Sequence, residues 1–154
     1  VLERTGKRIR FVPMKLAVGP NDVDDDVATA RRIQSQMKYG SRVEVLDTKD
    51  VRERIDVIKN AEVAVGMRLH FNLIATVLGA PTVAIAYNPK VRSFMRATDQ
   101  ELFTVDLSHD QLWKLPDLVL HRMAFGGSRH IPIQRLQDAA ALNWRVLEKV
   151  SSRA

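Results

Sequence analysis

Arg68 and His70 stand two residues apart, just after a short apolar segment, in the stretch VGMRLH. An arginine guanidinium can hold a phosphate or a carboxylate through two parallel hydrogen bonds. A histidine imidazole can exchange a proton near neutral pH. Together the two side chains could bind an anion and deliver a proton to it.

A second polar group closes the next apolar segment, where the chain reads Tyr87-Asn88-Pro89-Lys90. Asparagine is a favoured N-cap and proline is favoured at the first helical position, so a helix is predicted to begin here. A lysine in the first helical turn is unfavourable beside the helix dipole unless an anion is bound there. Lys90 is therefore a candidate anion ligand, although a solvated lysine accounts for it equally well. Tyr87 is either a core side chain or a hydroxyl donor at the same site.

Apolar patterns predict the elements that would position these residues. A chain of 154 residues suits one domain with a single core. Strands are predicted over 7–14, 42–46, 62–66, 82–86 and 102–105. Amphipathic helices are predicted over 22–38, 48–60 and 68–78, from 88 onward, from 108 with a break near Pro116, and over about 132–150. This alternation predicts an α/β fold, with a Rossmann-like parallel sheet of about five strands and helices on both faces.

The predicted fold would bring the two polar groups to one edge of the sheet. Ligands of such sheets bind beyond the carboxyl ends of the strands, where helix N-termini present unpaired amides. Residues two apart on a regular helix point to nearly opposite sides. Arg68 and His70 can therefore share a ligand only if Arg68 belongs to the turn or the first helical position and His70 to the first turn. The alternative for His70 is a histidine at the edge of the core, on the apolar stripe of this helix.

Composition narrows the classes of function. The chain has 24 Lys and Arg against 18 Asp and Glu, a net charge of +6, which favours an anionic partner. Acidic and basic residues alternate, and the few aromatic residues do not interleave with basic ones, so no nucleic-acid partner is expected. The absence of cysteine excludes disulfides and thiolate chemistry. No apolar stretch approaches the roughly 20 residues that cross a bilayer, and we expect a cytoplasmic location.

Several segments resemble the polysaccharide pyruvyl transferase family: VGMRLH, GAPTVAIAY, and YNPKV followed by Phe94. The family pattern is Gly-x-Arg-x-His, an apolar helix, Gly-x-Pro, an apolar strand and Tyr-Asp-Pro-Lys-Val. RFVPM, with the Asp22–Asp26 run after it, resembles the upstream strand-Pro-loop-Asp segment of the family. The resemblance runs from about residue 7 to residue 105, and loosely to the end. Asn88 departs from the usual aspartate. It can cap a helix but cannot transfer a proton, so we interpret position 88 as structural.

The resemblance implies a two-domain fold like that of the GT-B glycosyltransferases. Residues 1–154 would then be a single Rossmann-like domain, the C-terminal half of a longer enzyme, with 129–154 as its C-terminal helix region. The implied reaction transfers the enolpyruvyl group of phosphoenolpyruvate, as a cyclic ketal, to a sugar of a cell-envelope polysaccharide. Phosphoenolpyruvate is the donor substrate, and neither a cofactor nor a metal is expected.

The resemblance also implies roles for the candidate residues. Arg68, His70 and Lys90 would lie at the phosphoenolpyruvate site, and Tyr87 would line it. His70 is the candidate general acid, and the two cations would stabilise the departing phosphate. The other expected partners are a lipid- or nucleotide-linked sugar acceptor and the missing N-terminal domain. We therefore predict little or no turnover from this chain alone.

Two other functions stay open. The chain could be the donor-binding half of a GT-B nucleotide-sugar glycosyltransferase or epimerase, although no convincing acidic residue for a ribose follows a Gly-rich turn. It could also be a non-catalytic module that uses the same anion site for regulation. A contact with the inner face of the membrane through Arg145, Lys149 and Arg153 is a further hypothesis, which rests on three charges.

Overall fold

The computed structural model describes residues 1–16, 25–126, 137 and 141 of the chain. Its strands are β1 (Ile9–Phe11), β2 (Val43–Val45), β3 (Ala64–Gly66), β4 (Thr82–Ala86) and β5 (Thr104–Asp106). Its α-helices are α1 (Leu2–Thr5), α2 (Asp26–Gln36), α3 (Val51–Lys59), α4 (Leu69–Val77), α5 (Pro89–Ala97), α6 (His109–Leu112) and α7 (Leu115–Phe125). Two short 3-10 helices, η1 (Gly40–Arg42) and η2 (Glu101–Phe103), precede β2 and β5. The predicted C-terminal helix and the three basic residues of the membrane hypothesis lie outside the described residues, apart from positions 137 and 141.

The strands are all parallel, but they form two sheets. β1 pairs with β2, and a separate sheet has the order β3-β4-β5. The predicted α/β class with parallel strands and surrounding helices is confirmed, whereas one continuous five-stranded sheet is not observed. Val12 and Met14, which follow β1, pack on the core cluster around Ile58 and Phe71. The two sheets are therefore joined near this point by side-chain packing instead of a strand ladder.

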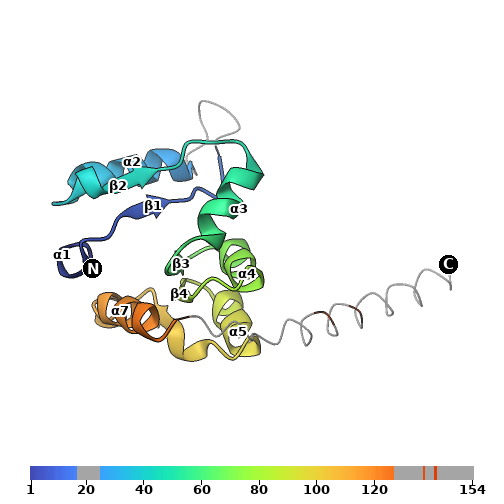
Figure 1. Ribbon diagram of the computed structural model, residues 1–154. Coiled ribbons are helices and arrows are strands. Elements are labelled where there is room, and N and C mark those ends of the chain that lie inside the picture. Colours follow the sequence, from blue (N-terminus) through green and yellow to red (C-terminus); the bar gives the residue numbers. More distant parts are fainter. Residues whose placement is uncertain (17–24, 127–136, 138–140, 142–154) are drawn as a thin grey trace.

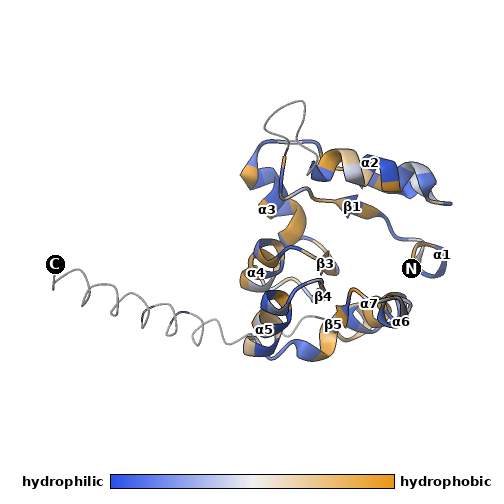
Figure 2. Cartoon of the chain, turned by 180° about the vertical axis from the view of Figure 1, so that it is seen from behind, coloured by the Kyte–Doolittle hydropathy of each residue, from blue (hydrophilic) through white to orange (hydrophobic). Residues whose placement is uncertain are grey.

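Helices cover the three-stranded sheet from both sides. Figure 1 shows α3, α4 and α5 in a row along one side of the strands, with α7 on the other. α4 packs on β3 and β4, and α5 packs on β4 and on α4. Figure 2 shows hydrophilic and hydrophobic residues on the same helices, as the amphipathic patterns predict. Val91 and Met95 of α5 are fully buried against Ala84 and Ala86. Burial of each of these two side chains stabilises the fold by about 1.5–3 kcal/mol.

Local signals begin and end several helices as predicted. The side chain of Asn88 accepts a hydrogen bond from the Val91 amide at 3.2 Å, and Pro89 opens α5. Gly79 follows α4 with a φ of 73°, the left-handed conformation that ends helices. α6 and α7 are separate, with Pro116 in the first turn of α7. Within the described part of the chain, no helix is both long and apolar enough to span a membrane.

Candidate functional site

The junction between β3 and α4 places Arg68 and His70 at a helix start. Arg68 is the N-cap residue of α4, in an extended conformation, and His70 is the second residue of that helix and is exposed. The geometric condition that the sequence sets for a shared ligand is therefore met by the backbone. Both side chains belong to the segment where the helix amides are unpaired.

Gly66 allows this junction to close tightly. A Cβ atom at position 66 would lie 2.2 Å from Oδ1 of Asn72 and 2.4 Å from Cδ1 of Phe71. Asn72 is buried, its Nδ2 donates to the Gly66 carbonyl at 3.3 Å, and its amide donates to the Arg68 carbonyl at 3.2 Å. Gly66 and Asn72 together fix the turn that carries Arg68.

The junction between β4 and α5 places the other two predicted site residues, Tyr87 and Lys90, at a helix start. Tyr87 is half-exposed and follows the strand directly, and Lys90 is the exposed second residue of α5. Asn88 holds the helix start through its side-chain oxygen, so its role as a cap is confirmed. The start of α5 thus carries a cationic residue, as the start of α4 does. Pro89 has no amide proton and the Val91 amide is bonded to Asn88, so these contacts leave the amide of Lys90 as the first-turn donor of α5.

The two junctions lie at the same edge of the sheet. β3 and β4 are adjacent and parallel, with Gly66 opposite Ala84 and the end of β4 two residues further on. α4 and α5 pack side by side along one side of the sheet, and each of them begins just after this edge. The backbone therefore brings the start of α4, with Arg68 and His70, beside the start of α5, with Tyr87 and Lys90.

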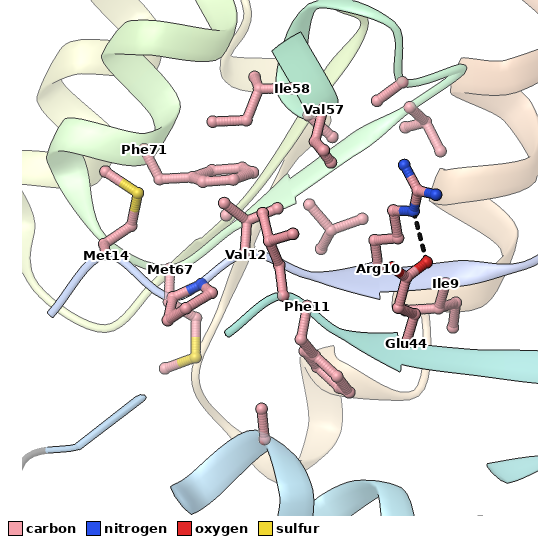
Figure 3. A pocket seen from close by; sticks show the side chains of 18 of the residues that line it. Ile9, Arg10, Phe11, Val12, Met14, Glu44, Val57, Ile58, Met67 and Phe71 are labelled. Atoms are coloured by element: carbon pink, nitrogen blue, oxygen red, sulfur yellow. Dashed lines mark hydrogen bonds and ion pairs between the residues drawn. The ribbon is translucent and has the colours of Figure 1, made fainter. Parts of the chain in front are cut away.

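A hollow with a cavity volume of about 1640 Å³ lies between β1 and β3 and reaches this edge. Met14, Met67 and Phe71 lie together at one end of it, and Arg10 and Glu44 form an ion pair at the other (Figure 3). Its lining is largely apolar and includes residues of α2, α3 and α7. Two of the predicted site residues, Arg68 and Tyr87, line the hollow, whereas His70 and Lys90 are not among its lining residues.

The guanidinium of Arg68 is held by Asp26, the first residue of α2. Nε of Arg68 donates to Oδ2 of Asp26 at 3.0 Å, and Nη2 of Arg68 donates to Oδ1 at 2.7 Å. Oδ2 also accepts hydrogen bonds from the amides of Met14 at 3.0 Å and Lys15 at 2.9 Å. The sequence indicated a favourable helix start at Asp26 but not this partnership across 42 residues. The strand-Pro-loop-Asp segment is the signal that could have drawn attention to it.

These contacts set the charge state of the carboxylate. Partial burial raises the pKa of Asp26, but the hydrogen bonds from Arg68 and from the Lys15 and Met14 amides outweigh burial and lower this pKa below its ordinary value. Asp26 is therefore a carboxylate at neutral pH, and the pair with Arg68 is ionic. Their side chains are 26% and 40% exposed, so solvent screens the attraction in part.

The ion pair between Asp26 and Arg68 should make the free energy of unfolding depend on pH. A carboxyl whose pKa is lower in the folded chain stabilises the fold above its unfolded pKa, about 3.9 for aspartate, and loses that contribution as the pH falls through the folded value. We expect Asp26→Asn to lower the free energy of unfolding by about 1 kcal/mol at pH 6 and by much less at pH 3. Urea unfolding of both proteins across this range measures the difference, and a difference independent of pH would contradict the assignment.

The polar side chains of the described residues do not gather into a metal centre. No group of three or more His, Asp or Glu side chains there gathers closely enough to hold a metal ion. The polar contacts at the sheet edge include those of Asp26, Arg68, Asn72 and Asn88, and an ion pair between Arg92 and Asp106 at the end of β5. The arrangement can bind an anion with cations and helix amides, and it can offer a histidine for proton transfer.

A family model described as polysaccharide pyruvyl transferase matches residues 1–89, more than half of the 154 residues. The matched region contains Asp26, Arg68, His70 and Tyr87 and ends one residue before Lys90. Comparison with curated proteins gives no match, and comparison with solved structures gives none either.

Proposed function

The chain belongs to the polysaccharide pyruvyl transferase family, and from this premise we propose that it binds phosphoenolpyruvate at the start of α4 and α5. The bound donor then passes its enolpyruvyl group, as a ketal, to a sugar of a cell-envelope polysaccharide. The pairing of β3 with β4 carries the proposal, because it sets both helix starts at one sheet edge. Each start provides the positive end of a helix dipole and a basic side chain, Arg68 or Lys90, which suits a ligand with a phosphate and a carboxylate.

The chemistry assigns a task to each residue. His70 donates a proton to the methylene carbon of the enol, which leaves an oxocarbenium-like centre for a sugar hydroxyl to attack. A second hydroxyl of the same sugar then replaces the phosphate. Of the two hydroxyl protons that are lost, one makes up for the proton added to the new methyl group, and the other leaves with the phosphate. Arg68 and Lys90 stabilise the charge of the departing phosphate. Tyr87 lines the donor site.

The rest of the reaction is assigned to groups beyond these residues. We propose that a further, N-terminal domain completes a GT-B-like enzyme and holds the acceptor, a lipid- or nucleotide-linked sugar, in the cytoplasm. Turnover is accordingly expected from the two domains together.

Isothermal titration of the 154-residue chain with phosphoenolpyruvate tests the donor site. We expect binding that weakens about ten- to a hundredfold in Arg68→Ala and in His70→Ala, since each loses a hydrogen bond to a charged group. Arg96→Ala is the matched control, because Arg96 is exposed on α5 and pairs with Glu101 away from the helix start. Parallel titration with a uridine or guanosine diphosphate sugar decides the main alternative. Tight binding of that ligand without binding of phosphoenolpyruvate would overturn the proposal.

A further inference from the structure

We propose that Asp26 is a positioning residue of the donor site, which holds the Arg68 guanidinium in the orientation that receives phosphoenolpyruvate. The inference rests on the proposed function, and it assigns a role to an aspartate on a different helix. Asp26 touches Arg68 and not the reacting atoms, so it acts through the arginine. The inference is drawn from the two hydrogen bonds that Nε and Nη2 of Arg68 donate to the two carboxylate oxygens of Asp26.

A two-point contact fixes more than a distance. Two parallel hydrogen bonds set the plane of the guanidinium, and with it the directions of all five N–H donors. The Arg68 side chain is 40% exposed, and a long exposed side chain otherwise keeps about 2 kcal/mol of rotamer entropy that binding must remove. An arginine already ordered by Asp26 loses less entropy when the donor binds, and this strengthens binding without any new contact.

Asp26 is itself held firmly enough to orient another group. Its Oδ2 accepts the amides of Met14 and Lys15, on the chain that leaves β1, and its backbone opens α2. Its side chain is only 26% exposed. The carboxylate therefore ties three segments together at the mouth of the hollow: the loop after β1, the start of α2 and the start of α4.

The lowered pKa of Asp26 separates positioning from proton transfer. Hydrogen bonds from Arg68 and from two amides stabilise the charged carboxylate, and a carboxylate stabilised in this way is a poor base for a sugar hydroxyl. Its oxygens are occupied by donors that belong to the protein. The geometry thus fits a group that stays ionised and orients its partner.

A double-mutant cycle tests the inference in the 154-residue chain. Asp26→Asn keeps the size of the side chain and an acceptor for the amides, but its NH2 group faces a guanidinium that needs acceptors. We expect Asp26→Asn to raise the Kd for phosphoenolpyruvate at least tenfold. In the Arg68→Lys background, which keeps a charge without the fork, the same change should alter the Kd by no more than twofold.

Asp25→Asn is the matched control for both charge and helix start. Asp25 is the N-cap of α2 and accepts the Val27 amide at 2.9 Å, a role that asparagine fills equally well. The Asp25→Asn substitution removes the same charge as Asp26→Asn, one residue away. We expect this substitution to leave the Kd for phosphoenolpyruvate within about twofold of the original. Urea unfolding of each variant verifies that it is folded at the temperature of the titration.

The outcomes separate this inference from the function on which it rests. If the unmodified chain binds phosphoenolpyruvate and Arg68→Ala weakens binding at least tenfold, the proposed function stands. An unchanged or tighter Kd in Asp26→Asn then overturns the positioning role alone. An equal loss in Asp25→Asn, or a full loss again in the Arg68→Lys background, overturns it as well, because the aspartate would then act independently of Arg68. No binding by the unmodified chain overturns the proposed function and the positioning role with it.

Discussion

Gly66→Ala is expected to lower the free energy of unfolding by about 3 kcal/mol, because the added methyl group has no space. Its carbon would lie 2.2 Å from Oδ1 of Asn72 and 2.4 Å from Cδ1 of Phe71, both on α4. Phe71 belongs to the core cluster and cannot move without disturbing Ile58 and Ala75. Since α4 must shift away from β3, the helix start that carries Arg68 moves with it, and phosphoenolpyruvate binding should fall together with stability.

Chemical denaturation and the donor titration measure these two effects on one protein. Asn72→Ala in the Gly66→Ala background removes the closest clashing atom but leaves the contact with Phe71. It also removes the hydrogen bond from Asn72 to the Gly66 carbonyl. We therefore expect the double variant to be more stable than the sum of the single losses predicts. Additive losses, or a Gly66→Ala protein as stable as the original, would show that the junction is less closely packed than the distances indicate.

Arg122→Ala is expected to cost about 3 kcal/mol, the second large effect. Arg122 lies in α7 and is 5% exposed. Its guanidinium carbon lies 4.0 Å from the centre of the Phe103 ring, and its Nη2 donates to Oε1 of Gln100 at 3.2 Å. Gln100 in turn donates to Thr76, at the end of α4. Truncation leaves a cavity and an unpaired buried amide oxygen, and both destabilise.

Arg122→Met separates the packing of this side chain from its charge. Burial lowers the pKa of Arg122, which means that the surroundings disfavour the charged form. Among the described residues no carboxylate forms an ion pair with it, and its Nε has no hydrogen-bond partner. Methionine fills similar space without that desolvation cost, but it also leaves the Gln100 oxygen without a donor. We therefore expect a loss of about 1–2 kcal/mol, smaller than that of Arg122→Ala. Thermal unfolding compares the two variants, and equal losses would show that the cation itself is required.

The sequence predicted best those parts of the fold that neighbouring residues determine. The bounds of β4 were predicted correctly, because Pro81 and Tyr87 flank a continuous apolar run. The start of α5 followed from Asn88 and Pro89, whose preferences act within one turn. The placement of Arg68 at the start of α4 likewise followed from an apolar strand, a glycine and an apolar helix in succession. Each of these features depends on contacts fewer than ten residues apart.

Features that depend on distant contacts were not predicted. Asp26 and Arg68 are 42 residues apart, and nothing local to either residue indicates the other. The division into two sheets is not visible in the apolar pattern of β1 or β3, and the sheets meet instead through the packing of Val12 and Met14 on the core cluster. The short helix α1 is held from outside, since Arg4 bonds Asp117 and Glu3 bonds Tyr39. The binding roles of Arg68, His70, Tyr87 and Lys90 stay predictions, for which the titrations provide the measurement.

The asparagine cap of α5 makes the two helix starts respond differently to acid. An amide does not titrate, so the bond between Asn88 and the Val91 amide survives at any pH at which the chain stays folded. The ion pair between Asp26 and Arg68 depends on an ionised carboxylate and is lost when that carboxylate is protonated. Acidification would therefore free the Arg68 side chain from Asp26 while the start of α5, with Lys90, kept its structure. With an aspartate at position 88 as well, both helix starts would lose a carboxylate contact on acidification.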